Sequence, residues 1–342
     1  MSGLTYRKAG VDVHAAAEFV ARIRPLAGST HTGDVVTPPS GFAGLIRLPA
    51  GTGTETPLLA ATCDGVGTKL LVARAMGEYE GLGRDLVAMS VNDLAAAGSR
   101  PLLFLDYLAT ARLDLAQLES IVRGVAAACC DVGCVLLGGE TAEMPDVYAD
   151  GGLDLAGFAV GIVEGNALPD PSTMRSGDIV VALPSSGLHA NGFSLTRRIL
   201  LERSELDLEA FLPELGRTLG AELLRPTALY VEPALGLMGD VSVRAAAHVT
   251  GGGLLGRAGA MLPGGLSMVI APDTYPRPPI IELIRTLGDL SWEETAATFN
   301  MGLGFLVVVA PQDAPTAEER GWLRVGELVA GDGKVDLGYT TG

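Results

Sequence analysis

A glycine-rich turn, Asp64-Gly65-Val66-Gly67-Thr68-Lys69, constrains the fold of this chain more than any other stretch. An apolar run over residues 58–63 precedes it and predicts a buried strand, and a second run over 70–76 predicts a helix. Backbone amides in such a turn can approach an anion closely, and a neighbouring carboxylate can hold a divalent cation. The order Thr-Lys excludes a Walker A loop. Taken alone, the turn fits a plain strand-to-helix connection as well as a phosphate site.

The chain is long enough for two domains. It has 342 residues, of which 48% are hydrophobic and 19% charged, and a single core rarely grows so large. Pro169 and Pro171 lie in a polar connection between two halves, and each half mixes predicted strands, helices and glycine-rich loops. We therefore predict a mixed α/β (α+β) protein with an N-terminal domain over 1–168 and a C-terminal domain over 169–342.

Local patterns predict the ends of several elements. Asp12 is expected to cap a helix with apolar residues at 16, 19, 20 and 23, and Pro25 is expected to end it. A second helix is expected over 83–97, with Gly98 as its stop. Asp114 is expected to cap a third helix, and a hairpin turn is expected over 51–54.

The acidic composition limits the partners. A net charge of −16 argues against nucleic acid and anionic membranes, because both would be repelled. A phosphate ligand therefore needs a local positive group or a metal, which favours Mg²⁺ held by carboxylates. No apolar run reaches the length of a membrane span, and the four cysteines fit reduced thiols. We expect a cytoplasmic protein that uses neither nucleic acid nor membrane as a partner.

Two further loops have compositions that packing does not demand. Residues 138–145, Gly-Gly-Glu-Thr-Ala-Glu-Met-Pro, follow a predicted strand, and Glu140 and Glu143 would share one side of a helical turn. Glu143 also fits a helix start, so Glu140 is the better metal candidate. His189 and Asn191 lie in a glycine-containing turn before a predicted helix, where both can contact a ligand.

Other enzyme classes receive weaker support from these loops. Ser185 and Ser186 beside His189 allow a hydrolase triad, but the chain lacks a Gly-x-Ser-x-Gly elbow there. Gly251-x-Gly253-x-x-Gly256 formally matches the dinucleotide fingerprint, with Asp273 near the expected distance, but it comes late in the chain. From the residues alone, we predict metal-assisted phosphate binding in the N-terminal half, and the reaction stays open.

Five motifs occur in order along the chain and together match one family. They are residues 64–69, Asn92-Asp93, residues 138–145, His189-Ala190-Asn191-Gly192-Phe193-Ser194 and His248-Val249-Thr250-Gly251-Gly252-Gly253-Leu254. Tyr-Arg-Lys-Ala-Gly-Val-Asp over 6–12 and Asn-Met-Gly-Leu-Gly over 300–304 extend the match over nearly the full length. The chain resembles the aminoimidazole ribonucleotide synthetase (phosphoribosylformylglycinamidine cyclo-ligase) family.

This resemblance implies an ATP-dependent ring closure in de novo purine biosynthesis. In such enzymes ATP phosphorylates the formyl amide oxygen of formylglycinamidine ribonucleotide, and the amidine nitrogen then closes the imidazole ring. The implied cofactors are ATP and Mg²⁺, with a monovalent cation as an optional addition. The implied assembly is a homodimer joined through its N-terminal sheets, with the nucleotide near that interface.

The resemblance also assigns residues by motif position. The implied metal ligands are Asp64, Asp93 and Glu140. The implied catalytic residues are His189 and Asn191, which would face the substrate or the transferred phosphoryl group, and Lys69. The implied nucleotide and anion contacts are Gly65, Gly67, Thr68, Lys69, Gly138, Gly139, Thr141, Gly251, Gly252 and Gly253.

One segment departs from the family, and related families offer alternatives. Residues 27–44 lack the usual basic, glycine-rich run, so we expect no nucleotide contact from them. A selenophosphate synthetase is expected to carry a reactive cysteine near its N-terminus, whereas the first cysteine here is Cys63. The hydrogenase-maturation carbamoyl dehydratase is expected to carry a C-terminal cysteine, and residues 338–342 contain none. Thiamine-monophosphate kinase and a non-enzymatic nucleotide-binding adaptor are further alternatives.

Overall fold

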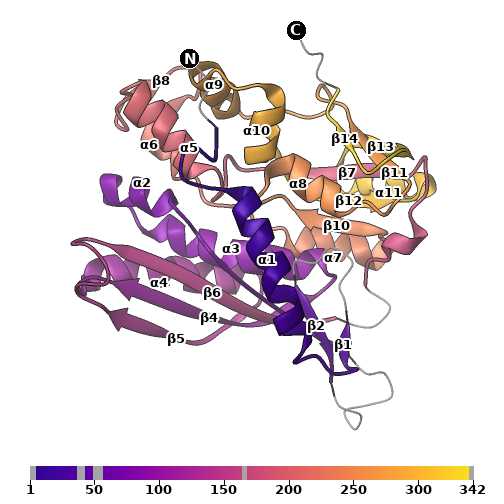
Figure 1. The fold of residues 1–342 in the computed structure, drawn as a ribbon, viewed down its shortest axis with the longest axis horizontal. Coiled ribbons are helices and arrows are strands. Elements are labelled where there is room, and N and C mark those ends of the chain that lie inside the picture. The colour runs from indigo at the N-terminus through magenta and orange to yellow at the C-terminus, as the bar shows by residue number, and fades with distance from the viewer. Residues whose placement is uncertain (1–4, 37–42, 49–56, 164–167, 339–342) are drawn as a thin grey trace.

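Two six-stranded sheets, one from each half of the chain, organise the structure (Figure 1). The structure is a computed structural model, and it describes residues 5–36, 43–48, 57–163 and 168–338. The last strand of the first sheet ends at Val163 and the first strand of the second begins at Ile179. The expected mixed α/β architecture in two halves is therefore confirmed, while the boundary at 168/169 stays a prediction. No helix in these ranges is both long and apolar enough to cross a bilayer.

The first sheet is covered by helices on one face. Its strands in spatial order are β1 (Val35–Val36), β2 (Gly44–Arg47), β3 (Leu58–Gly65), β6 (Leu153–Val163), β4 (Arg100–Thr110) and β5 (Val135–Glu143). Neighbouring strands are antiparallel except β4 and β5, which are parallel. Its helices are α2 (Lys69–Met76), α3 (Glu80–Ala96) and α4 (Leu115–Asp131). The side chain of Asp114 caps α4 as expected, because it accepts from the first-turn amides.

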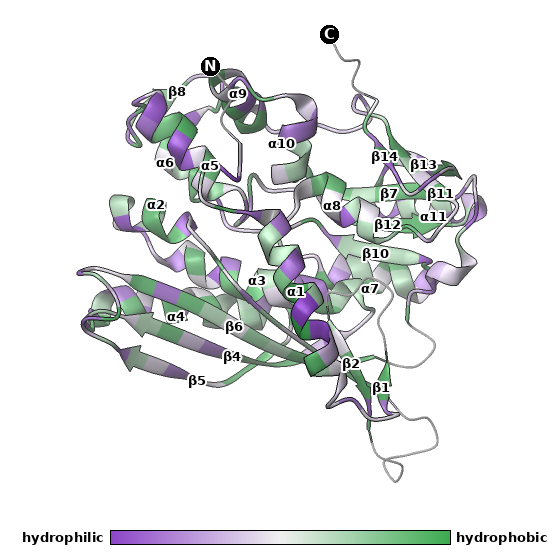
Figure 2. Ribbon diagram, in the orientation of Figure 1, coloured by the Kyte–Doolittle hydropathy of each residue, from purple (hydrophilic) through white to green (hydrophobic). Residues whose placement is uncertain are grey.

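The second sheet has a core strand that is buried on both faces. Its strands in spatial order are β10 (Ala245–His248), β12 (Leu303–Val309), β7 (Ile179–Pro184), β13 (Leu323–Ala330), β11 (Leu266–Ile270) and β14 (Val335–Asp336). Every residue of β12 is buried, and β7 and β12 are hydrophobic along their lengths (Figure 2). Neighbours are antiparallel except β11 and β14.

Short helices and a small ribbon surround this second sheet. They are η1 (Pro171–Thr173), α5 (Phe193–Arg197), the π-helical η2 (Arg198–Arg203), β8 (Phe211–Leu212), β9 (Arg217–Thr218), α6 (Leu219–Leu223), α7 (Val231–Asp240), α8 (Gly253–Ala260), α9 (Pro279–Gly288), α10 (Trp292–Thr298), η3 (Pro311–Asp313) and α11 (Ala314–Glu319). The sequence patterns did not predict α10, α11 or β13.

Helix α3 joins the two halves. It packs on β3 and β6 of the first sheet, and it also contacts α7 and β10 of the second half. Nearly every side chain of α3 is buried, including the polar residues Asp85, Asn92 and Asp93. Buried polar side chains need partners, so this helix carries polar groups into the contact between the halves.

The first helix, α1 (Val13–Gly28), begins as expected and ends later than expected. Asp12 caps it by accepting from the amides of His14 and Ala15. Pro25 lies inside the helix, so the prediction that it ends α1 was wrong. Residues 21–28 are exposed, and water can therefore satisfy the carbonyl that Pro25 leaves without a donor. The apolar face predicted for this helix is also exposed, with Phe19 62% accessible.

Residues 138–143 are extended, which corrects the expected turn. They continue β5 through Glu143 in parallel pairing with β4. Successive strand residues face opposite sides, so Glu140 and Glu143 cannot share one side as they would on a helix. The second expected helix, α3, begins earlier, at Glu80, and Gly98 follows its end with a φ of 71°. The expected hairpin turn over 51–54 lies outside the described residues.

Close packing of α3 on α4 gives a test of the fold. A Cβ on Gly124 would collide with the Glu80 carbonyl, so Gly124→Ala should lower the free energy of unfolding by about 1–3 kcal/mol. Gly239→Ala on α7 is the matched control, because its Cβ would meet nothing within 4 Å. Urea unfolding followed by circular dichroism measures both. Equal stability of the two variants would contradict the packing.

Candidate active site

The opening motif forms a strand-to-helix connection that contacts the second half of the chain. Asp64 and Gly65 end β3, Gly67 and Thr68 form the turn, and Lys69 begins α2. The hydroxyls of Thr68 and Ser194 are 2.9 Å apart, although 126 positions separate them in sequence. Two of the motifs found in the sequence therefore meet in space.

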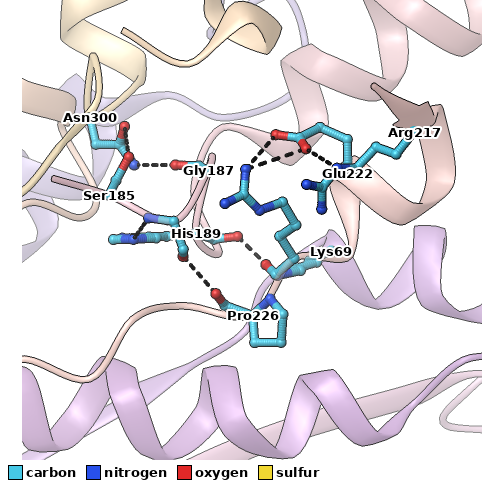
Figure 3. Close-up of polar contacts among 10 residues, drawn as sticks. Lys69, Ser185, Gly187, His189, Arg217, Glu222, Pro226 and Asn300 are labelled. Atoms are coloured by element: carbon cyan, nitrogen blue, oxygen red, sulfur yellow. Dashed lines mark hydrogen bonds and ion pairs between the residues drawn. The ribbon is translucent and has the colours of Figure 1, made fainter. Parts of the chain in front are cut away.

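The loop between β7 and α5 carries His189 and is held from several directions (Figure 3). The Asn300 amide donates to the Gly187 carbonyl at 2.8 Å, and the Ser186 hydroxyl donates to the Pro226 carbonyl at 2.6 Å. His189 itself has a φ of 60°, a left-handed conformation that non-glycine residues rarely adopt. Such strain persists only where surrounding contacts fix the backbone, and it is common at functional sites.

The His189 ring is buried, neutral and oriented. Its Nε2 accepts from the Ser186 amide at 3.2 Å, which leaves Nδ1 as the protonated nitrogen. Nδ1 is buried and has no protein partner. Burial, together with the neighbouring His248 and the cationic Lys69 and Arg225, holds the pKa of His189 well below 6.5. The ring can therefore donate a hydrogen bond from Nδ1 to an oxygen of a ligand.

The Lys69 ammonium binds groups of the protein itself, and its expected contact with a phosphate stays a prediction. Its ammonium lies 2.6 Å from Asp85 and donates to the carbonyls of His189 at 3.1 Å and Arg225 at 2.7 Å. Lys69 and Asp85 are both completely buried. Burial lowers the pKa of Lys69 and raises that of Asp85, and their contact opposes both shifts. Within the protein the ammonium thus meets one carboxylate and two carbonyl oxygens.

Asp93 and Asp64 approach each other beside a buried histidine. His248 Nδ1 lies 3.2 Å from Asp93, and its Nε2 lies 3.4 Å from the Asn92 amide. Burial raises the pKa of Asp64; the Gly65 amide opposes this shift and the negative charge of Asp93 adds to it. Asp64, which is partly buried, and Asp93, which is buried, thus form a pair of carboxylates at the contact between the halves.

A positive group faces this pair of carboxylates. Burial lowers the pKa of Arg257 on α8, and the negative charges of Asp93 and Asp64 oppose that shift. Arg257 also donates to the Gly251 carbonyl at 3.1 Å. The carboxylates and the guanidinium therefore share one environment with the 251–253 loop.

The glycines at 251–253 bring α8 close to its neighbours. A Cβ on Gly253 would collide with the Ala296 carbonyl, and Gly253 also has a φ of 63°. The amides of Gly253 and Leu254 donate to the carbonyls of Thr250 and Phe299, so these two amides are used within the protein. Beside them, Thr250 Oγ1 and Asn191 Nδ2 are buried without a protein partner. Unpartnered buried groups of this kind usually await a ligand or water.

Strand β5 directs Glu140 away from this cluster. Asp64 pairs with Gly157, Gly157 pairs with Asp106, and Asp106 pairs with Gly139, so these residues face the helix-covered side of the sheet. Glu140 follows Gly139 and therefore faces the opposite, exposed side. Within one chain, Glu140 therefore lies away from Asp64 and Asp93, and its expected role as a metal ligand stays a prediction. Gly138, Gly139 and Thr141 are likewise exposed on this edge strand.

The two remaining carboxylates fit a magnesium–nucleotide complex. In the described ranges, no three His, Cys, Asp or Glu side chains are arranged to hold a metal. Mg²⁺ commonly binds through one or two carboxylates together with phosphate oxygens and waters, rather than in an all-protein cage. Asp64 and Asp93 therefore fit a metal that arrives with phosphates, and they do not make a protein-only metal site.

Three residues of the site were not predicted from the sequence. Asp85 follows Arg84 near the start of α3, and nothing in its local sequence marks it. Tyr230 donates to the Pro184 carbonyl at 2.8 Å and lies 3.4 Å from His189 Nε2, but nothing in its local sequence marks it. Thr250 lies inside a recognised motif, yet only its burial shows that its hydroxyl lacks a partner.

The fold and site define a class of protein. Residues 43–163 match the family model "AIR synthase related protein, N-terminal domain", and 175–337 match the corresponding C-terminal domain. The solved HypE–HypF complex is similar in fold, with a TM-score of 0.66 at 18% identity over 94% of this chain and 97% of that one. Thiamine-monophosphate kinase from Stenotrophomonas maltophilia is also similar, with a TM-score of 0.61 at 22% identity over 94% and 95% of the chains.

Curated relatives narrow the class. The chain is 47% identical over 338 residues to phosphoribosylformylglycinamidine cyclo-ligase from Myxococcus xanthus, covering 97% of this chain and 98% of the relative. It is 42% identical over 342 residues to the enzyme of that name from Carboxydothermus hydrogenoformans, covering 98% and 99%. The chain belongs to the phosphoribosylformylglycinamidine cyclo-ligase family.

The neutral, buried His189 predicts a pH dependence of stability. Below about pH 6.5 the unfolded histidine gains a proton that the folded ring does not, so the wild type should lose at most about 1.4 kcal/mol of unfolding free energy per pH unit. The His189→Gln variant should not show this contribution to the loss of unfolding free energy. The difference in unfolding free energy between wild type and variant should therefore become smaller toward acid pH. Urea unfolding between about pH 7 and pH 5 measures it. A constant difference would contradict the assignment.

Proposed function

We propose that this chain catalyses the ATP-dependent cyclisation of formylglycinamidine ribonucleotide to aminoimidazole ribonucleotide, with release of ADP and phosphate. The single observation that carries this proposal is 47% identity along nearly the whole length of a cyclo-ligase. The formyl amide oxygen takes the γ-phosphoryl group and leaves as phosphate. The amidine nitrogen attacks the formyl carbon and loses a proton, which closes the ring. A cytoplasmic location and these two small-molecule substrates belong to the same proposal.

Neutral hydrogen-bond donors support the phosphoryl-transfer step. His189 Nδ1, Asn191 Nδ2 and Thr250 Oγ1 are all buried and all lack protein partners. A donor in a site without water stabilises developing oxygen charge more strongly than it would in solution. We assign these three groups to oxygens of the transferred phosphoryl group or the amide. Because His189 is neutral, it can donate a hydrogen bond from Nδ1 without bringing a full charge into the site.

Asp64 and Asp93 would hold the Mg²⁺ that accompanies ATP. When bound, the metal offsets the charge of the triphosphate. The His248 contact at 3.2 Å fixes the Asp93 carboxylate, and the Gly65 amide donates to Asp64 at 2.7 Å. Gly65, Gly67 and Thr68 would lie along the phosphates beside this pair, as would the 251–253 loop.

A homodimer would supply the residues that one chain directs elsewhere. Large apolar side chains are exposed on the side of the first sheet opposite α3 and α4, among them Tyr107, Val135 and Phe158. An exposed apolar face of this kind is typical of an interface. We propose that two copies join through this face and that Glu140, with Gly138, Gly139 and Thr141, completes the nucleotide site of the partner.

A direct assay tests the reaction. Purified protein with ATP, Mg²⁺ and formylglycinamidine ribonucleotide should form aminoimidazole ribonucleotide and ADP in equal amounts. Omitting the ribonucleotide should abolish ADP release, because the amide oxygen is the phosphoryl acceptor. ATP binding without any cyclised product would instead favour the nucleotide-binding adaptor.

Mixed dimers test whether Glu140 acts across the interface. Asp64→Asn and Glu140→Gln should each inactivate the homodimer. In a mixed dimer one site carries both substitutions and the other carries neither, so a random mixture should regain about a quarter of wild-type activity. Sedimentation confirms the exchange of subunits. If both residues serve one site of the same chain, every site in a mixed dimer is damaged and no activity returns.

A further inference from the structure

A buried ion pair in the first half of the chain forms hydrogen bonds with two loops of the second half. Lys69 begins α2, and Asp85 lies on α3. Asp85 accepts from the amide of Thr227 at 2.7 Å and from its hydroxyl at 2.6 Å, while Lys69 donates to the carbonyls of His189 and Arg225. The pair therefore fixes residues 225–227 and His189 relative to the first sheet.

The His189 backbone needs such a support. Its φ of 60° is rare for a residue with a side chain, and the Lys69 ammonium donates to the His189 carbonyl at 3.1 Å. The ring on the same residue is oriented separately, by the Ser186 amide at Nε2. A Cβ on Gly304 would lie only 2.9 Å from His189 Cε1, so the ring packs closely on this glycine. The backbone and ring contacts together fix the direction in which His189 Nδ1 points.

Stability alone gives a weak reason for a buried ion pair. Removing two charges from water costs about as much as their attraction returns, and apolar pairs of similar volume often serve equally well. What an ammonium adds is direction, because its three hydrogens must each meet an acceptor. Here the acceptors are the Asp85 carboxylate and the carbonyls of His189 and Arg225.

We propose that Asp85 and Lys69 form a positioning pair that holds His189 in its left-handed conformation and presents Nδ1 to the reacting oxygen. The proposal rests on the proposed function, since it gives His189 a substrate to contact. Neither residue of the pair touches substrate. Asp85 orients Lys69, and Lys69 orients the His189 carbonyl.

Charge-neutral variants separate positioning from folding. Lys69→Met alone should lower the melting temperature, because it leaves the Asp85 carboxylate buried without a cation. Adding Asp85→Asn removes that charge and keeps an acceptor for Thr227, so the double variant should regain most of the lost stability. Its kcat should stay about 100-fold below wild type, as expected for a misplaced catalytic group, with KM for ATP within about threefold.

Each contrary outcome overturns the proposal. Recovery of both stability and kcat in the double variant would show that the pair serves folding alone. A raised KM for ATP with unchanged kcat would show that Lys69 contacts the nucleotide. Assays are run below the melting temperature of each variant, so that incomplete recovery of stability does not obscure the kcat.

NMR of labelled histidine rings tests the positioning pair without measuring turnover. The chain has four histidines, so selective labelling gives few signals to assign. The wild-type His189 ring should show a protonated Nδ1 that does not titrate near neutral pH, and the double variant should shift this signal while His14 and His31 keep theirs. Failure of the wild type to form product would reject the proposed function. Unchanged His189 signals in the double variant would reject the positioning pair.

Discussion

The arrangement of the site depends on the contacts of the Lys69 ammonium. These contacts connect the two halves of the chain, whose described strands form separate sheets. Lys69 lies in the first half of the chain, and two of its three acceptors are carbonyls of the second half. Asp85 supplies the opposite charge, and Thr227 binds Asp85 in turn. Without the Lys69 ammonium, the two sheets could still pack through α3. Residues 225–227 and the loop of His189 would then lose the contacts that fix their position relative to the first sheet.

Several side chains near Lys69 that could contact a ligand are buried away from water. His189, His248 and Tyr230 lie with ring centres about 6 Å apart, in a region that water does not reach. Burial keeps His189 neutral, and the low local dielectric strengthens any hydrogen bond that it gives. The same burial leaves donors on His189, Asn191 and Thr250 without partners. A fold tolerates such unsatisfied groups where a ligand completes them.

The alternation of side chains in the first sheet divides the recognised motifs between two faces. Asp64 faces α3 and the second half of the chain, whereas Glu140 faces the exposed side three strands away. One face therefore builds the contact between the halves, and the other offers apolar surface and an acidic residue to a partner. The proposed dimer would bring these two faces, one from each copy, together at one nucleotide.

The sequence by itself determined the class of fold, the strand-to-helix turn at 64–69, the caps at Asp12 and Asp114 and the family, because these depend on local patterns and motif spacing. It also singled out His189, Asn191, Asp64 and Asp93, and the structure brings these residues into one region. Local pattern could not decide that 138–143 are extended, since glycine-rich acidic runs fit turns and edge strands alike. Only the tertiary structure decided that Lys69 binds Asp85 and that Glu140 faces away, because side-chain partners are set by which chain segments pack together.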